Sequence, residues 1–111
     1  MKLNDEQTQE VYKILTTDFP IHPAFQQMRA TSVQSASRKL MVSDITNPRK
    51  QAEWVYQTLL SCDFTPEILD MLVETAYKLY TFAEFYRPES VEKAHLMFMR
   101  AVAVRNYVKG N

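Results

Sequence analysis

The fold is decided by residues 65–111, TPEILDMLVETAYKLYTFAEFYRPESVEKAHLMFMRAVAVRNYVKGN. This stretch holds two long apolar segments joined by the short polar sequence RPES, and apolar residues recur in both at spacings of three and four, the period of an α-helix. The pattern predicts one helix over 66–87 and another over 90–109. We expect this hairpin, residues 65–109, to form the hydrophobic centre of the protein.

The last predicted helix carries two apolar faces. At about 100° per residue, one stripe falls on one side of the helix and a second falls nearly opposite. The first stripe contains Ala94, Met97, Phe98, Ala101, Val104 and Val108. The second contains Leu96, Met99, Ala103 and Tyr107. A helix with two apolar faces needs two partners, so either the other helices surround it or its second face binds another chain.

Capping residues and prolines predict the remaining helices. Asn4 and Gln7 have the spacing of a capping box, which predicts a first helix that ends before Pro20. A second helix is expected over 23–42, weakened by its hydroxyl side chains, and a third over 48–61 after an Asn-Pro pair. The only glycine is Gly110, which disfavours a sheet protein with several hairpin turns.

These patterns predict an all-α fold, a compact bundle of four to five helices in a single domain over residues 1–111. The helix over 66–87 is apolar around most of its circumference. Water is expected along one narrow polar line, where Glu74 and Lys78 have the spacing of an ion pair. The line contains Asp70, Glu74, Lys78, Thr81 and Glu84.

Composition limits the classes of protein that the chain can represent. The hydrophobic fraction of 46% is typical of a folded protein. Thirteen basic residues balance thirteen acidic ones and the pI is about 6.7, so the chain has no net positive charge to attract nucleic acid or anionic membranes. The single cysteine, Cys62, excludes an internal disulfide. No apolar run approaches the roughly 18 residues of a membrane span, and residues 1–10 lack a signal core. We therefore expect a cytoplasmic protein without a membrane partner.

No catalytic or cofactor motif is present. HExxH, CxxC, GxSxG, GxxxxGK and GxGxxG are all missing from the sequence. Glu92 and His95 have the ExxH spacing of helical metal sites, but such a site needs a second ExxH pair and further glutamates. The expectation is a protein that is not an enzyme and that holds neither a metal nor a cofactor.

DNA binding is also disfavoured. The segments over 48–61 and 66–87 resemble a helix-turn-helix in outline. The second of them would present Glu67, Asp70 and Glu74 to the phosphate backbone, where DNA readers carry cations and amides.

Two surfaces are candidates for binding. The only tryptophan, Trp54, lies away from the apolar stripe of its helix, which suits either an interface anchor or packing beneath an earlier helix. The segment 29–50 is rich in cations and hydroxyls that suit phosphate, and we expect Tyr77, Tyr80, Tyr86 and Arg87 to be available for stacking on bases. The candidate anion ligands are Arg29, Arg38, Lys39 and Arg49.

One motif invites comparison with a known group of proteins. The sequence PxSxEKA, residues 88–94, follows a helix rich in Ala, Leu and aromatic residues, and it resembles small phage proteins that sequester cyclic nucleotides. The resemblance covers about thirty residues of sequence common at helix boundaries, so no site residue is carried over from it.

The sequence favours a small regulator, of a kind found in bacteria or phages, that binds a protein partner or its own copies. The predicted interface contains Leu96, Met99, Ala103, Tyr107 and Trp54. The alternative is a binder of a nucleotide, a cyclic nucleotide or a short RNA through residues 29–50.

Overall fold

The helices of the computed structural model follow the sequence pattern. The structure describes residues 2–19 and 47–110. Within these ranges it contains no strand, so the all-α prediction is confirmed, while the helix predicted over 23–42 lies outside the described residues. The elements are α1 (Asp5–Leu15), α4 (Pro48–Ser61), α5 (Pro66–Tyr86), the short 3₁₀ turn η2 (Pro88–Ser90) and α6 (Val91–Lys109).

α1 begins with the predicted capping box. The side chain of Asn4 accepts a hydrogen bond from the Gln7 amide (2.8 Å), and the Gln7 side chain accepts one from the Asn4 amide (3.2 Å). Two amides that have no partner within the helix are satisfied in this way. The amide of Leu3 donates to the carbonyl of Cys62 (2.9 Å), so the start of α1 is tied to the turn between α4 and α5.

α4 and α5 each begin at a proline that follows a capping side chain. The side chain of Asn47 accepts from the Lys50 amide (3.1 Å), and the hydroxyl of Thr65 accepts from the Ile68 amide (3.2 Å). Proline suits the first helical position because the amide it lacks would have no partner there. α4 ends at Cys62, whose φ of 53° is left-handed, and the predicted bounds 48–61 are confirmed.

α6 begins without a side-chain cap. Ser90 precedes it, and its hydroxyl does not cap the helix. The turn η2 provides the entry instead, because the amide of Ser90 donates to the carbonyl of Arg87 (2.8 Å). The helix ends at Gly110, whose φ of 80° is a conformation that glycine adopts without steric cost.

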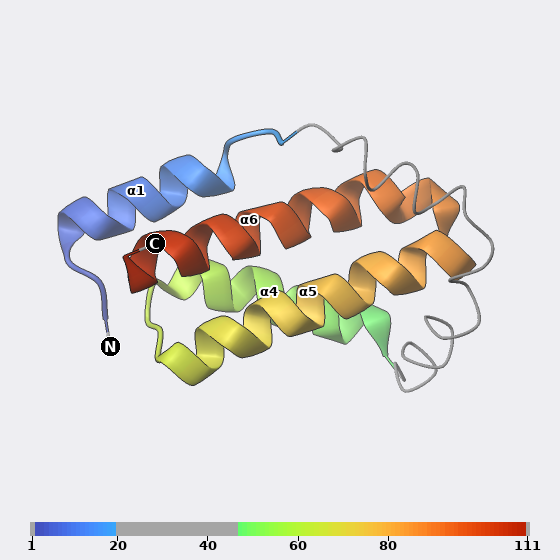
Figure 1. The fold of residues 1–111 in the computed structure, drawn as a ribbon, viewed down its shortest axis with the longest axis horizontal. Coiled ribbons are helices and arrows are strands. Elements are labelled where there is room, and N and C mark those ends of the chain that lie inside the picture. Colours follow the sequence, from blue (N-terminus) through green and yellow to red (C-terminus); the bar gives the residue numbers. More distant parts are fainter. Residues whose placement is uncertain (1, 20–46, 111) are drawn as a thin grey trace.

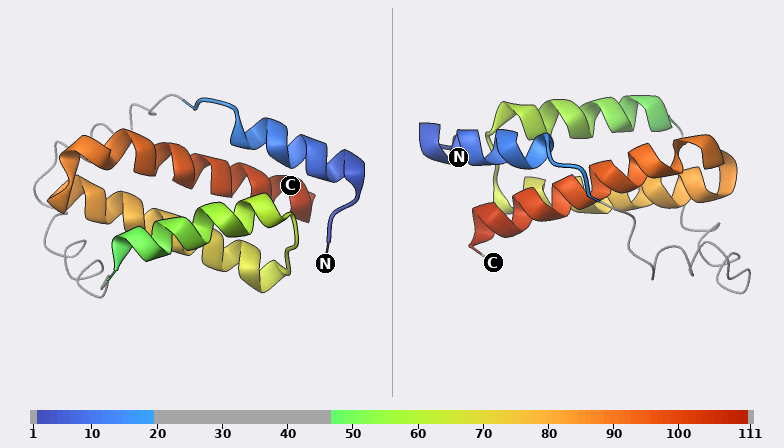
Figure 2. Two further views of the ribbon diagram at one scale, coloured as in Figure 1. Left: turned by 180° about the vertical axis from the view of Figure 1, so that it is seen from behind. Right: turned by 90° about the horizontal axis from the view of Figure 1, so that it is seen from above.

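The α5–α6 hairpin is the centre of the packing. In Figure 1, α1 and α5 lie along opposite sides of α6, and Figure 2 shows that α4 crosses the back of the hairpin. α6 contacts the other three helices and packs most extensively against α5. The arrangement agrees with a last helix that the other helices surround.

The buried hydrophobic residues of the described chain form two clusters. The large core is built from all four helices and the turns between them, and the small core is built from α5 and α6 alone. The large core contains Leu3, Val11, Val55, Leu59, Cys62, Phe64, Leu69, Leu72, Ala76, Leu79, Ala101 and Val104. The small core contains Tyr80, Ala83, Val91 and Ala94.

The first stripe of α6 is directed into these cores. Ala94, Ala101 and Val104 are buried, and Met97, Phe98 and Val108 pack against the buried residues. One predicted face of the last helix is therefore confirmed as core.

The polar line of α5 is confirmed only in part. Glu74 and Lys78 form the expected ion pair (3.4 Å). Thr81 is wrong as a solvent-facing residue, because only 1% of it is exposed. Its hydroxyl donates to the carbonyl of Tyr77 one turn earlier (3.0 Å), which satisfies the polar group without water.

A second ion pair joins the ends of the hairpin. Lys109 near the end of α6 lies 2.8 Å from the Asp70 carboxylate in the first turns of α5. The hydrogen bond from Lys109 lowers the pKa of Asp70, and the charge of Arg105 acts in the same direction.

None of the described helices combines the length and the apolar character needed to cross a membrane.

Candidate functional site

The second apolar face of α6 is only partly exposed. Leu96, Met99 and Ala103 are half-buried, and 37% of Tyr107 is exposed. That this face binds another chain stays a prediction. The face nevertheless offers less apolar surface than the sequence pattern suggested.

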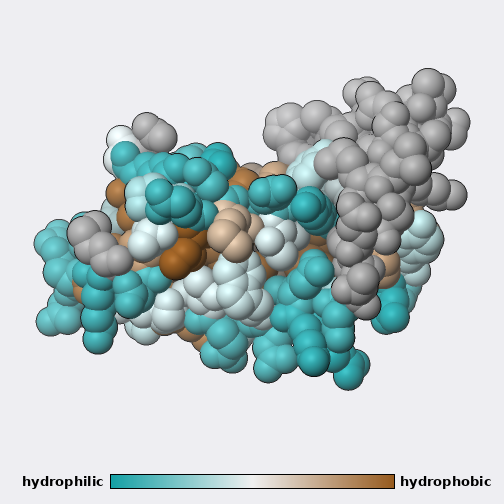
Figure 3. Space-filling view, turned by 90° about the horizontal axis from the view of Figure 1, so that it is seen from below, coloured by the Kyte–Doolittle hydropathy of each residue, from teal (hydrophilic) through white to brown (hydrophobic). Residues whose placement is uncertain are grey.

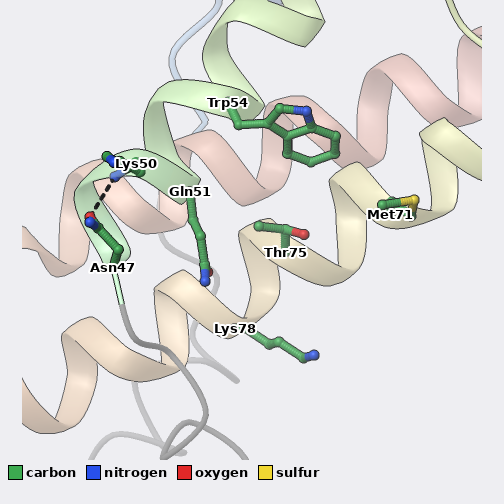
Figure 4. A pocket seen from close by; sticks show the side chains of 7 residues that line it. All are labelled: Asn47, Lys50, Gln51, Trp54, Met71, Thr75 and Lys78. Atoms are coloured by element: carbon green, nitrogen blue, oxygen red, sulfur yellow. Dashed lines mark hydrogen bonds between the residues drawn. The ribbon is translucent and has the colours of Figure 1, made fainter.

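Trp54 lies at the edge of a groove between α4 and α5. Figure 4 shows that Trp54 and Gln51 extend from α4 toward α5, where Thr75 and Met71 lie across from them. The exposed fractions are 38% for Trp54 and 52% for Met71, and the groove encloses about 380 Å³. We call this feature the α4–α5 groove; its residues are Asn47, Lys50, Gln51, Trp54, Met71, Thr75 and Lys78.

The surrounding surface is mixed in character. Figure 3, which views the molecule from the α5 side, shows hydrophobic and intermediate residues across the middle of the face with hydrophilic groups at its margins. Lys50 and Lys78 lie at the polar end of the groove, and Lys78 is already paired with Glu74. The apolar part of the groove therefore has a polar rim, a pattern typical of protein interfaces.

The predicted anion-binding residues are divided by the structure. Arg29, Arg38 and Lys39 lie outside the described residues, and only Arg49 is described. Arg49 borders a cavity of about 510 Å³ between α4 and the α5–α6 hairpin. Arg87 and Lys93 border the same cavity, so three cations from separate parts of the chain lie around it.

The aromatic residues expected to stack on bases differ in how far they are exposed. Tyr80 is wrong for this role, because it is fully buried in the small core. Tyr77 is half-buried and packs edge-on against Phe98, with ring centroids 5.4 Å apart. Tyr86 is 51% exposed, and its ring packs against those of Phe82 and Phe85, with centroids 5.0 Å and 6.4 Å away. The hairpin uses most of its aromatic residues for packing.

His95, considered above for metal binding, is buried beside Tyr80. Only 1% of it is exposed, and its ring lies edge-on to Tyr80 with centroids 5.6 Å apart. Glu92 is exposed on the same helix. In residues 2–19 and 47–110, no three His, Cys, Asp or Glu side chains are grouped so that they could hold a metal ion.

Cys62 lies in the large core with 3% of its surface exposed. Its thiol is 3.9 Å from the carbonyl of Leu59, to which it donates weakly. Burial raises the pKa of the thiol, and hydrogen bonds with Thr8 and Tyr12 act against this effect. A buried thiol with a raised pKa is a poor nucleophile.

Comparison with known proteins adds no family to this description. No protein-family model, no curated protein and no solved structure matches the chain.

Two features of these sites were missed by sequence reasoning. Met71 was read only as part of an apolar helix, and Lys93 only as part of a helix start. Both depend on where α4 crosses the hairpin, which residue spacing along one helix cannot reveal. A weak signal was present for Met71, because it lies beside the predicted polar line at Asp70 and Glu74.

Proposed function

We propose that this chain is a non-enzymatic interaction protein that self-associates through the α4–α5 groove. The observation that supports the proposal is the pair of exposed apolar side chains, Trp54 and Met71, that lie on either side of that groove. Both residues belong to well-packed helices, so the surface needs no refolding to bind.

The residue types favour protein binding. Tryptophan is among the residues most enriched at energetic hot spots of interfaces, and methionine adapts its shape to a partner. Removing the exposed parts of both side chains from water is favourable by about 25 cal/mol for each Å² of apolar area.

A second copy of this chain is the partner that the groove suits. In a twofold dimer the same patch serves both subunits, so Trp54 of each copy would enter the groove of the other and pack near Met71. The groove of about 380 Å³ offers the space for such a side chain. The net charge of zero means that two copies do not repel each other at long range.

The interface predicted on α6 remains a prediction. Leu96, Met99 and Ala103 are half-buried, so substitutions there carry a greater risk of unfolding than substitutions in the groove. The binding of a nucleotide or RNA through residues 29–50 is likewise a prediction, and most of its candidate ligands lie outside the described residues.

Light scattering over a range of concentrations tests the proposal. The wild type is expected to form a dimer, and Trp54→Glu and Met71→Glu are each expected to weaken dimerisation by more than about tenfold, because each places a charge in an apolar contact. Circular dichroism verifies that both variants fold. Tyr56→Glu is the matched control, since Tyr56 is 54% exposed and lies two residues from Trp54, on the opposite flank of α4.

The outcomes separate the two interfaces. A wild type that stays monomeric at all concentrations contradicts self-association. If the groove variants still dimerise, but Leu96→Glu or Met99→Glu folds and fails to dimerise, the interface lies on α6 and the groove is rejected. Equal effects of Trp54→Glu and Tyr56→Glu would also reject it.

A further inference from the structure

A second hollow lies on the other flank of α4, where it faces α6. The cavity of about 510 Å³ is bounded by the start of α4, the second half of α5 and the start of α6. Its size falls within the range of small-molecule sites in proteins, about 300 to 1,000 Å³. Lys50 and Trp54 border the α4–α5 groove, whereas Arg49 and Ala52 border this cavity, so the two sites use different faces of one helix.

The floor of the cavity is apolar. Apart from the cations, Ser90 is the only described lining residue with a polar side chain. A ligand body with several hydrogen-bonding groups would lose water there without gaining partners, which is costly. The apolar side chains include Ala52, Leu79, Phe82, Ala83, Ala94 and Met97.

The rim is cationic. Arg49 comes from α4, Arg87 from the end of α5 and Lys93 from the first turn of α6, and no described lining residue is acidic. None of these three cations forms an ion pair with another described residue. Guanidinium groups bind carboxylates and phosphates through paired hydrogen bonds, so the rim is complementary to an anionic head group.

We propose that this cavity binds a small organic anion with an apolar body, such as an aliphatic carboxylate or an alkyl phosphate. The head group lies between Arg49 and Arg87 with Lys93 beside it, and the body packs on Leu79, Phe82 and Met97. The chemistry differs from that of a nucleotide, whose base would find few hydrogen-bond partners on the floor. The site is independent of the proposed dimer.

Four probes of matched design test the ligand class by NMR titration of the labelled protein. Octanoate and octyl phosphate carry linear alkyl chains of nearly the same length on different anionic heads, 1-octanol carries such a chain without charge, and AMP carries a phosphate on a polar body. At least one of the two C8 anions is expected to shift the amides around Ala83 and Ala94 in a saturable manner. Binding of one anion alone identifies its head group, and 1-octanol and AMP are expected to bind at least about tenfold more weakly.

Variants test the location. Arg49→Gln and Arg87→Gln are each expected to weaken binding about tenfold, because one charged hydrogen-bond donor is lost. Both residues are exposed, so the variants should fold. Ala52→Leu keeps all three cations and fills part of the cavity, and it is expected to reduce binding as well. Lys50→Gln, which removes the next cation on α4 but lies in the other groove, is expected to have no effect.

Several results would overturn the proposal. Absence of binding by both C8 anions rejects the site. If 1-octanol binds as tightly as the C8 anions, the cations do not contribute to binding. If AMP binds as tightly as they do, the site does not require an apolar ligand body. Binding that is unchanged by Arg49→Gln, Arg87→Gln and Ala52→Leu places the ligand elsewhere.

Discussion

The large core and the small core are built on the same two helices, and both are buried, but the described helices that contribute to them differ. In the large core, α1 and α4 cover the hairpin, and their residues Val11, Val55 and Leu59 are almost completely buried. In the small core, the described buried residues come from α5 and α6 only, and Arg49 and Ala52 of α4 border a cavity nearby. The hairpin therefore carries two buried clusters, and the cavity proposed as a ligand site lies beside the small one.

The difference has a physical cause. A core that is enclosed on all sides is packed to the density of an organic crystal and leaves no room for a ligand. Where α4 begins, its first turns carry the charged residues Arg49 and Lys50, which are exposed and extend the helix without filling the space beside it. The cavity beside the small core therefore combines an apolar floor with the cations of its rim.

Matched valine substitutions on α6 are expected to give the largest difference in stability between the two cores. Val104 lies in the large core and Val91 in the small core, and their exposed fractions are 0% and 1%. Truncation to alanine removes two carbons from each, at about 1.5 kcal/mol, and a cluster held by α1 and α4 as well as by the hairpin adds about 1 kcal/mol for a cavity that cannot collapse. We expect urea denaturation to give a loss near 2.5 kcal/mol for Val104→Ala and near 1.5 kcal/mol for Val91→Ala.

Both variants must be measured at one protein concentration, because self-association would add to the apparent stability. Equal losses, or a larger loss for Val91→Ala, would contradict the idea that α1 and α4 make the large core the more rigid of the two.

Much of the fold could be predicted because its signals are local. The Asn-Pro and Thr-Pro pairs fix the starts of α4 and α5, and the capping box fixes the start of α1. Thr81 could not be placed correctly, because the bond from its hydroxyl to Tyr77 lets a polar residue be buried. The left-handed Cys62 was also unexpected, since glycine is the usual residue at such a helix end.

The candidate sites were less predictable than the helices. Trp54 and Arg49 were singled out by residue type, and both border hollows in the structure. Their partners, Met71 and Lys93, are brought to them by the way α4 crosses the hairpin. Such a crossing depends on packing between helices distant in sequence, and a single sequence carries no direct record of it.

The starts of α1 and α6 offer a second, smaller test of the comparison. α1 helps to enclose the large core and has a complete capping box, whereas Ser90 before α6 makes no capping bond. Asn4→Ala is expected to lower the free energy of unfolding by about 1 kcal/mol, because the Gln7 amide loses its partner. Ser90→Ala is expected to change it by less than about 0.5 kcal/mol. Hydrogen exchange of the Gln7 amide gives a local readout, and a costly Ser90→Ala variant would show that the entry to α6 depends on a bond of this hydroxyl.

The smallest expected effect is a pH dependence that reports on how well the large core excludes water. Burial raises the pKa of the Cys62 thiol above its ordinary value of 9.0, against the weaker effects of Thr8 and Tyr12. The unfolded chain therefore loses this proton at a lower pH than the folded chain does. The contribution of the thiol to stability is complete below pH 9.0 and falls as the pH rises toward the folded pKa.

Cys62→Ala isolates the contribution of the thiol to stability, because the wild type and the variant share every other titrating group. The free energy of unfolding of the wild type, minus that of Cys62→Ala, is expected to decrease as the pH rises above 9.0. A thiol reagent should also react more slowly with the folded protein than with the unfolded one. A difference that stays constant with pH, together with a fast reaction of the folded protein, would mean that water reaches Cys62 and that the large core is open at the turn between α4 and α5.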